Sequence, residues 1–381
     1  METLSAPRRD CAEMQWRRGR AWAAEKGGQM MRVMEKKQVL LLISTLFGIA
    51  LLGIMIWLAR PMAILARIKA LGAGGISAFV ISVIVGFSFG VEGWRRLLRD
   101  YGLNYSFRRT FGMMAGAYAV TYLTPSFYLG GEPVRAFAAS DGFTRRTHEV
   151  VATIFIERLI YLIVIASFLL AGGIIGLESS SISGGLQQGI VGLAGTALVV
   201  SGIALVGMSR RATWASRFFT AVLRHLPQWK WVKRMQDGLV SVEAEVNAAL
   251  NDHRWATLHA ATLFALSVGM NVVSPLIFFF FAYGRILPAD QLVLFFALSV
   301  VLSVFTWITP GGIGVTEGGY AAVFAIMGLP IDGAVAFSLM QKLASMCIVG
   351  VGMGYLAHHG IDYFGRRKST RKRIDQREGM T

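Results

Sequence analysis

The sequence predicts an all-α polytopic membrane protein with about six spanning helices and two re-entrant helical hairpins arranged as an inverted repeat. Its 381 residues are 54% hydrophobic and only 16% charged, a balance that is typical of membrane proteins rather than water-soluble domains. The hydrophobic residues gather in about eight apolar segments. Glycine and proline interrupt two of these segments, whereas the others continue for roughly the length of a membrane span.

Four apolar segments run for about twenty residues without a charge, which is the length that a helix needs to cross the hydrocarbon core. They cover residues 39–59, 71–91, 188–208 and 260–284. Two further predicted spans contain ionisable residues: the span 150–177 holds Glu157 and Arg158, and the span 331–358 holds Lys342. Charges at such depth are costly, so we expect these side chains to be paired or functional.

The two interrupted segments carry glycines and a proline, which disfavour a continuous helix. The breaks lie at the end of segment 111–129 and within segment 291–331, at Gly130, Gly131, Pro310, Gly311 and Gly312. Broken helices in corresponding positions of two repeats point to a transport site near the middle of the membrane. Alternatively, the glycines mark loops at the ends of ordinary spans.

The net charge of +16 reflects basic residues between the apolar segments, and such stretches favour the cytoplasm. If every apolar segment crossed the membrane once, the loop that holds Arg145 would face the wrong side. The conflict disappears if the segment 111–140 enters from the cytoplasm and turns at the first break, while 291–328 enters from outside and turns at the second. Both termini then lie in the cytoplasm, at the cell inner membrane. The unit 71–177 is thereby repeated, inverted, in 260–358.

The chain divides into three parts. Residues 1–36 form a basic cytoplasmic tail that we expect to be disordered, residues 37–364 form the transmembrane domain, and residues 365–381 form a second basic cytoplasmic tail. Within the transmembrane domain, the segment 209–256 mixes tryptophan with lysine and arginine, which suits a cytoplasmic segment lying at the membrane interface. No basic motif of the RNA-binding type is present, so we expect no nucleic-acid partner.

The first break predicts the start of a new helix. Pro133 suits the first turn of a helix, so the helix begins at Gly131 or Glu132 and runs toward Ser140. A helix N-terminus behind glycines presents backbone N–H groups and positive dipole to a phosphate or carboxylate. Arg135 lies one turn further on, where it either adds a bidentate contact or pairs with Glu132. Both interpretations remain open.

The second break predicts another short helix, which runs to Met327. Thr316 is placed to cap this helix, behind Gly314, with Glu317 in its first turn. The Glu317 carboxylate either complements the helix dipole or faces a cavity. Lys342 is its candidate partner from the last span.

Adjacent helical residues point about a hundred degrees apart, so we expect Glu157 and Arg158 to pair with different helices. Arg135 is the candidate partner of Glu157, and Glu132 or Glu317 is that of Arg158. Structural ion pairs and a transport pathway explain these charges equally well.

The sequence contains no HExxH, GxSxG, Walker A or paired CxxC motif, so we expect neither an enzyme nor a metal or cofactor site. Glycine pairs at four-residue spacing, including Gly350 and Gly354, predict close packing between helices.

Taken together, the two motifs 130–135 and 310–318 resemble the transmembrane region of lysylphosphatidylglycerol synthases, whose wider family is flippase-like. The adjacent pair Glu157 and Arg158 and the basic residue in the last span also fit, so the resemblance covers roughly 39–358. Glu132 stands where the family commonly has Asp, and Lys342 stands where Arg is more usual. The soluble aminoacyl-transferase domain of full-length synthases is expected to be missing.

The resemblance implies movement of an aminoacylated phospholipid, a lipid-linked sugar or a hopanoid-related lipid between leaflets. We therefore expect a flippase or facilitator for an anionic, aminoacylated or glycosylated lipid, with Arg135 and Lys342 holding the headgroup. One alternative is an accessory subunit that positions a lipid-modifying or glycosyl-transferring enzyme, and another is an ion-coupled transporter of small solutes. The predicted substrate-binding residues are Gly130, Gly131, Glu132, Arg135, Glu157, Arg158, Pro310, Gly311, Gly312, Gly314, Glu317 and Lys342.

Overall fold

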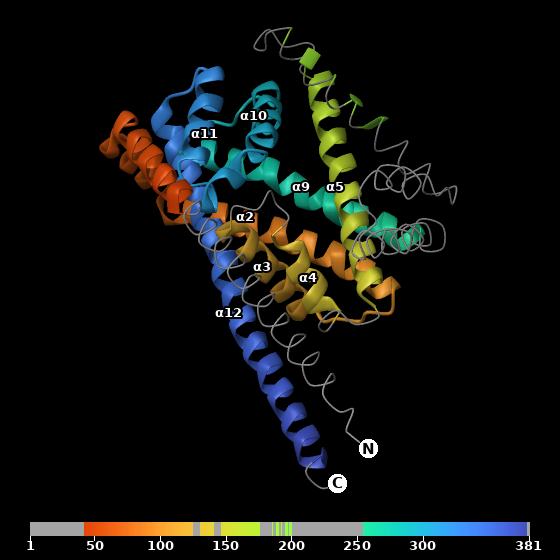
Figure 1. Ribbon diagram of the computed structural model, residues 1–381. Coiled ribbons are helices and arrows are strands. Elements are labelled where there is room, and N and C mark those ends of the chain that lie inside the picture. Colours follow the sequence, from red (N-terminus) through yellow and green to blue (C-terminus); the bar gives the residue numbers. More distant parts are fainter. Residues whose placement is uncertain are drawn as a thin grey trace, which may run out of the picture.

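The computed structural model describes residues 42–124, 130–140, 146–175 and 254–378, with a few positions between 185 and 199. This described part is helical and contains no strand (Figure 1). Four of its helices are long and apolar enough to cross a membrane: Pro61–Asp100, Thr147–Ala171, Trp255–Tyr283 and Ile331–His359. The prediction of an all-α multi-pass membrane protein is therefore confirmed.

Some predicted segments differ from the structure or fall outside the described residues. The predicted span 39–59 corresponds to the shorter apolar helix Leu42–Leu58. The tail 1–36, most of the predicted span 188–208 and nearly all of the segment 209–256 lie outside the described residues. The predicted tail 365–381 continues the last helix, which runs to Glu378.

The two halves of the described chain repeat one order of elements: a long helix, a shorter helix, a break, a short helix and a long helix. The first half consists of α2 (Pro61–Asp100), α3 (Phe107–Leu123), α4 (Glu132–Ala139) and α5 (Thr147–Ile175). The second half consists of α9 (Arg254–Tyr283), α10 (Ala289–Ser303), the 3-10 turns η2 (Thr306–Ile308) and η3 (Pro310–Gly312), α11 (Val315–Ile326) and α12 (Ile331–Glu378).

The packing repeats as well. Helix α12 packs against α3 as α5 packs against α10, and α11 packs against α12 as α4 packs against α5. The last helix of each half thus lies against the second helix of the other half. Figure 1 shows α2 and α9 at the centre of this arrangement, with α12 extending beyond the other helices.

Glycines hold the central pair α2 and α9 close together. A Cβ added to Gly75 would lie 2.8 Å from the Phe281 ring, and one added to Gly93 would lie 2.7 Å from the Phe264 ring. The N-terminal part of α2 thus meets the C-terminal part of α9 and the reverse, so the two helices run antiparallel. Small residues let helix backbones approach closely where no hydrophobic force drives them together.

After the C-terminal end of α2, the chain forms α3 and α4 and then returns to that same end of α2. The Tyr105 hydroxyl donates to the carbonyl of Ala139 at 2.7 Å, and the Arg146 guanidinium donates to the carbonyl of Tyr101. The hairpin formed by α3 and α4 therefore begins and ends beside the C-terminal end of α2.

The second hairpin, formed by α10 and α11, begins and ends at the opposite end of the central pair. Arg67 Nε lies 2.7 Å from the Asp332 carboxylate at the start of α12, and Arg67 Nη1 donates to the carbonyl of Ala282 at the end of α9 at 3.4 Å. Since α2 and α9 are antiparallel, the two hairpins start from opposite ends. This geometry agrees with the predicted inversion, while the number of crossings and the depth of each turn stay predictions.

The prediction that Gly350 and Gly354 mark the packing face of α12 is wrong. A Cβ at Gly350 or Gly354 meets no atom within 4 Å, whereas one at Gly352 would lie 2.1 Å from the carbonyl oxygen of Ala115 in α3. Two residues correspond to about 200° around a helix. The packing face is therefore the one that carries Gly352.

Candidate functional site

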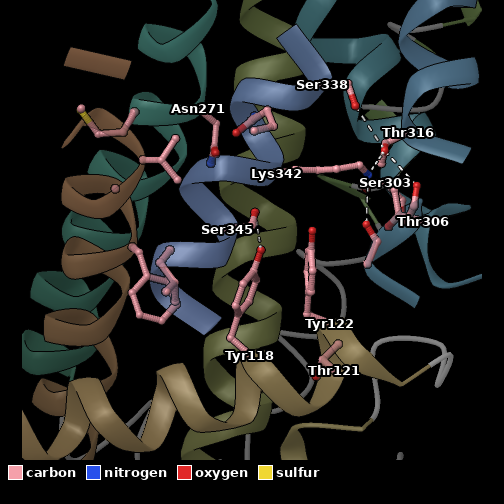
Figure 2. A pocket seen from close by; sticks show the side chains of 18 of the residues that line it. Tyr118, Thr121, Tyr122, Asn271, Ser303, Thr306, Thr316, Ser338, Lys342 and Ser345 are labelled. Atoms are coloured by element: carbon pink, nitrogen blue, oxygen red, sulfur yellow. Dashed lines mark hydrogen bonds between the residues drawn. The ribbon is translucent and has the colours of Figure 1, made fainter. Parts of the chain in front are cut away.

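A cavity of about 450 Å³ lies between the two halves. Its walls come from α2, α3, α5, α9, α11 and α12, from the end of α10, and from the 3-10 turns of the second break. Figure 2 shows side chains from these elements pointing into one space. Both repeats are therefore needed to build the cavity.

Hydroxyl and amide groups dominate the polar lining. These side chains are Tyr118, Thr121, Tyr122, Thr124, Tyr161, Ser267, Asn271, Ser303, Thr306, Thr309, Thr316, Tyr320, Ser338, Gln341 and Ser345. Apolar side chains and glycines complete the wall, and Lys342 is the charged residue among the described lining residues. A site with this lining exchanges hydrogen bonds with a polar ligand far more readily than it attracts a net charge.

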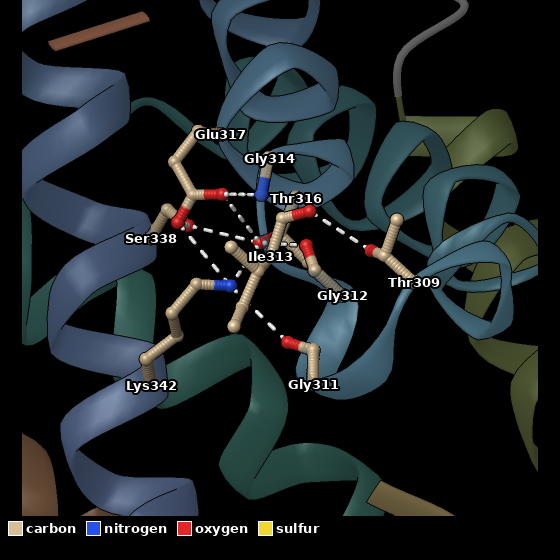
Figure 3. Close-up of polar contacts among 9 residues, drawn as sticks. All are labelled: Thr309, Gly311, Gly312, Ile313, Gly314, Thr316, Glu317, Ser338 and Lys342. Atoms are coloured by element: carbon tan, nitrogen blue, oxygen red, sulfur yellow. Dashed lines mark hydrogen bonds and ion pairs between the residues drawn. The ribbon is translucent and has the colours of Figure 1, made fainter. Parts of the chain in front are cut away.

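Lys342 forms a closed network with the second break (Figure 3). Its ammonium donates to Thr316 Oγ1 at 2.6 Å and to the carbonyl of Gly311 at 3.2 Å. It also lies 3.2 Å from a carboxylate oxygen of Glu317. The predicted pairing of Lys342 with Glu317 is therefore confirmed, and each ammonium hydrogen has an acceptor.

The Glu317 carboxylate is fully buried behind Lys342. One of its oxygens accepts from Ser338 Oγ at 3.0 Å, and the other accepts from the backbone N–H of Gly314 at 2.7 Å. A buried carboxylate needs such partners. Glu317 thus ties the start of α11 to α12.

The prediction that Thr316 caps α11 is wrong. The helix begins at Val315, and Gly314 is the residue before it, with φ of 79°. Only glycine adopts this left-handed conformation without steric cost. Thr316 is already helical, and its hydroxyl donates to the carbonyl of Gly312 at 2.9 Å.

The first break leads to a second cluster of charges, between α4 and α5. Arg135 Nη1 lies 3.1 Å from a carboxylate oxygen of Glu157, and a second nitrogen contacts the other oxygen. Both side chains are buried, and the Arg135 guanidinium lies 4.0 Å from the centre of the Trp94 ring. The predicted pairing of Arg135 with Glu157 is confirmed.

Arg158 pairs with Glu132, which was one of its two candidate partners. Arg135 and Glu132 therefore each pair with α5 rather than with each other. The expectation that Glu157 and Arg158 pair with different helices is wrong, since both pair with α4. The two α4 residues lie about one turn apart on one face, so long side chains from adjacent α5 positions reach both.

The two repeats carry corresponding ion pairs. Glu132 begins α4 and pairs with Arg158 of the next long helix, 26 residues later. Glu317 lies in the first turn of α11 and pairs with Lys342 of the next long helix, at nearly the same separation. Each pair ties the short helix after a break to the long helix that follows it.

The structure divides the predicted substrate-binding residues into two groups. Gly311, Gly312 and Lys342 line the cavity, and Pro310, Gly314 and Glu317 belong to the same break behind it. Gly130, Gly131, Glu132, Arg135, Glu157 and Arg158 belong to the region of α4 and α5, and none is among the residues that line the cavity. A Cβ at Gly131 would lie 2.4 Å from the Ala117 carbonyl oxygen, so this glycine permits α4 to pack on α3.

Most of the lining residues were not predicted from the sequence, although two patterns mark them. Beyond Asp332, the first turns of α12 are mainly apolar, and Ser338, Gln341, Lys342 and Ser345 recur there at helical spacing, which places them on one face. Tyr118 and Tyr122 show the same spacing in α3, and the Tyr118 hydroxyl is hydrogen bonded to Ser345 Oγ at 3.0 Å.

A second cavity of about 270 Å³ adjoins the first, and its lining combines apolar side chains with hydroxyl and amide groups. Its apolar walls are Ile165, Val268, Pro275, Phe295, Phe296, Val300 and Phe337. It shares Tyr161, Asn271, Ser303, Tyr320 and Gln341 with the larger cavity. We call the larger one the polar cavity and the smaller one, which has the higher share of apolar lining residues, the apolar cavity. No group of three potential metal ligands occurs among the described residues.

These features define a multi-pass membrane protein with a polar cavity at the junction of two structural repeats. The model of the family described as lysylphosphatidylglycerol synthase TM region matches residues 41–352, and the chain therefore belongs to that family. This membership gives the protein a membrane-embedded role in lipid handling. No curated protein and no solved structure matches the chain.

Proposed function

We propose that the protein moves a lipid between the leaflets of the membrane, with the headgroup in the polar cavity and an acyl chain in the apolar cavity. The observation that carries this proposal is that the two cavities adjoin through five shared residues. An amphiphile needs a hydrogen-bonding compartment and an apolar compartment side by side. The headgroup is otherwise exposed to hydrocarbon, where each unpaired polar group costs several kcal/mol.

The same observation favours a lipid over a small polar solute. A solute transporter needs a polar site, but it gives no role to an adjoining apolar cavity walled by Phe295, Phe296 and Phe337. The size of the polar cavity, about 450 Å³, falls within the range of small-molecule sites. It therefore suits a headgroup rather than a whole phospholipid.

We propose transport rather than catalysis for this cavity. Lys342 is the candidate base in it, yet its ammonium is paired with Glu317 and bonded to two further acceptors. An ammonium whose three hydrogens are all engaged by acceptors has no position left for a reacting group. The pair instead serves to hold the second break open toward the polar cavity.

The first cluster has a supporting role in this proposal. Arg135 is 4% exposed, pairs with Glu157 and lies over Trp94. An interaction with a headgroup would have to break this pair, which leaves a buried charge unpaired. We therefore assign Arg135 and Glu157 to the positioning of α4 against α5, and Lys342 to the cavity itself.

A blocked cavity tests the proposal. Asn271 lines both cavities, so Asn271→Trp fills their junction. The matched control is Leu266→Trp on the same helix, where the native side chain is 47% exposed on the outer surface. Both variants and the native protein are reconstituted into vesicles that contain fluorescent phospholipids, and headgroup exposure is followed by quenching from outside.

We expect the native protein and Leu266→Trp to expose inner-leaflet lipid faster than empty vesicles, and Asn271→Trp to act like empty vesicles. Equal rates for the native protein and Asn271→Trp would show that lipid does not pass through these cavities. A native rate equal to that of empty vesicles, across headgroups that include a glycosylated and an aminoacylated one, would refute lipid movement altogether.

A further inference from the structure

We propose that the polar cavity selects a polyhydroxylated headgroup, a sugar or a polyol, over an aminoacylated headgroup with a free amine. This inference rests on the proposed function and specifies its substrate class. It depends on three observations: the chemistry of the lining, the state of its charges, and a buried tyrosine hydroxyl without a partner.

The lining matches hydroxyl groups. Serine, threonine and tyrosine hydroxyls both donate and accept, and the amides of Asn271 and Gln341 carry one donor group and one acceptor. The hydroxyls of a sugar or polyol also both donate and accept, so each can meet such a lining in more than one orientation. An ammonium group donates only, and it is best bound by carboxylates.

The charged groups at the cavity disfavour the binding of an amine. Of the described lining residues, the charged one is Lys342, which is itself an ammonium. The carboxylate next to it, Glu317, has no exposed surface and is engaged by Lys342, Ser338 and the N–H of Gly314. Among the described lining residues, an amine on the headgroup therefore meets a like charge and no available carboxylate.

Tyr122 supplies the observation that calls for a ligand. Its hydroxyl oxygen is buried and has no hydrogen-bond partner, although Tyr122 lines the polar cavity. The ring is fixed by the second break, since a Cβ at Gly311 would lie 2.9 Å from it. Figure 2 shows the hydroxyl directed into the same space as Lys342 and Thr316. Buried polar groups are nearly always satisfied, and a headgroup hydroxyl supplies the missing bond.

A pair of tyrosine rings lies beside this hydroxyl. Tyr118 and Tyr122 lie with ring centres 5.8 Å apart, one turn apart on α3. Together they present apolar ring faces next to hydroxyl groups. A sugar or polyol carries the same alternation of C–H and O–H groups, whereas an aminoacyl group concentrates its polarity in one charge.

The test uses three lipids with identical acyl chains: glucosyl-diacylglycerol, phosphatidylglycerol and lysyl-phosphatidylglycerol. The first carries a neutral sugar, the second carries a polyol on a negatively charged phosphate, and the third carries the free amine. Headgroup-specific chemical labelling measures each in vesicles that hold the native full chain. We expect the first two lipids to move at least about ten times faster than the third, because a charge that stays unpaired in a buried site lowers the affinity by more than about tenfold.

Two tyrosine variants separate recognition from stability. Tyr122→Phe removes the hydroxyl in the cavity. Tyr283→Phe removes another buried hydroxyl without a partner, on a residue that does not line the cavity. We expect Tyr122→Phe to slow the movement of glucosyl-diacylglycerol between leaflets several-fold while thermal stability is unchanged. Tyr283→Phe should leave this rate at the native value.

The outcomes distinguish this inference from the proposed function. Movement of lysyl-phosphatidylglycerol as fast as the sugar lipid overturns the headgroup selectivity and leaves lipid movement standing. The selectivity is also overturned if Tyr122→Phe moves glucosyl-diacylglycerol at the native rate. Failure of all three lipids to exceed empty vesicles overturns the proposed function itself.

Discussion

Replacing Lys342 by methionine removes the ammonium but keeps an unbranched side chain of similar shape. The Glu317 carboxylate then loses its counter-charge while it stays fully buried, with the hydroxyls of Ser338 and Thr316 and the N–H of Gly314 as remaining partners. Removal of one partner of a buried ion pair is strongly destabilising because a charge is left uncompensated. The prediction concerns the free energy of unfolding, which is separate from transport.

The expected loss follows from the burial of the two side chains. Breaking a buried pair costs about 3–5 kcal/mol. The Lys342 side chain keeps 15% exposure, toward the cavity, whereas that of Glu317 has none. Water in the cavity therefore screens part of the charge, and we expect the lower end, about 3 kcal/mol. The double variant Lys342→Met with Glu317→Gln removes both charges, so it should recover at least half of this loss.

Unfolding in mixed micelles, followed by tryptophan fluorescence, measures these free energies. Lys69→Met serves as the control because Lys69 is an exposed lysine of α2, and we expect it to change stability by less than about 0.5 kcal/mol. The reasoning is refuted if Lys342→Met costs less than about 1 kcal/mol, or if the double variant is no more stable than the single one.

Two further predictions concern the repeat and its packing. Glu132→Gln breaks the pair that corresponds to Lys342 and Glu317, but the charge left behind, on Arg158, has a side chain that is 54% exposed rather than fully buried, so the same unfolding assay should show a loss smaller than the roughly 3 kcal/mol expected for Lys342→Met. A loss as large as that of Lys342→Met would contradict this ranking. Gly352→Ala places a methyl group against the Ala115 carbonyl and should cost about 1–3 kcal/mol. Gly354→Ala faces open space, and because alanine has the higher helix propensity it should be neutral or stabilise the protein by up to about 1 kcal/mol, so equal effects would show that Gly352 does not form the contact.

Hydrophobic length and breaking residues made much of the fold predictable. The apolar stretches 71–91, 150–177, 260–284 and 331–358 fall largely within the four long helices, because a helix satisfies its backbone hydrogen bonds within the segment itself, as lipid requires. Pro133 predicted that α4 begins at Gly131 or Glu132, since proline is accommodated in the first turn of a helix, and the helix begins at Glu132.

The charges were predictable as pairs because a charge inside the membrane has few available partners. Arg135 with Glu157 and Lys342 with Glu317 could be matched in this way. The start of α11 was not predicted correctly, since the left-handed conformation of Gly314 permits an earlier start than the threonine signal indicates. The preference of threonine for a capping position was therefore overridden by the backbone turn at Gly314.

By itself, the sequence determined which segments are apolar enough to span, where the two breaks fall and which charges need partners. Only the tertiary structure decided which helix faces meet. In lipid both faces of a helix are apolar, so hydrophobic periodicity does not separate the inner face from the outer one. The direction of Gly352 rather than Gly350, and the convergence of Tyr122 and Asn271 on one cavity, follow from how the two repeats pack around α2 and α9.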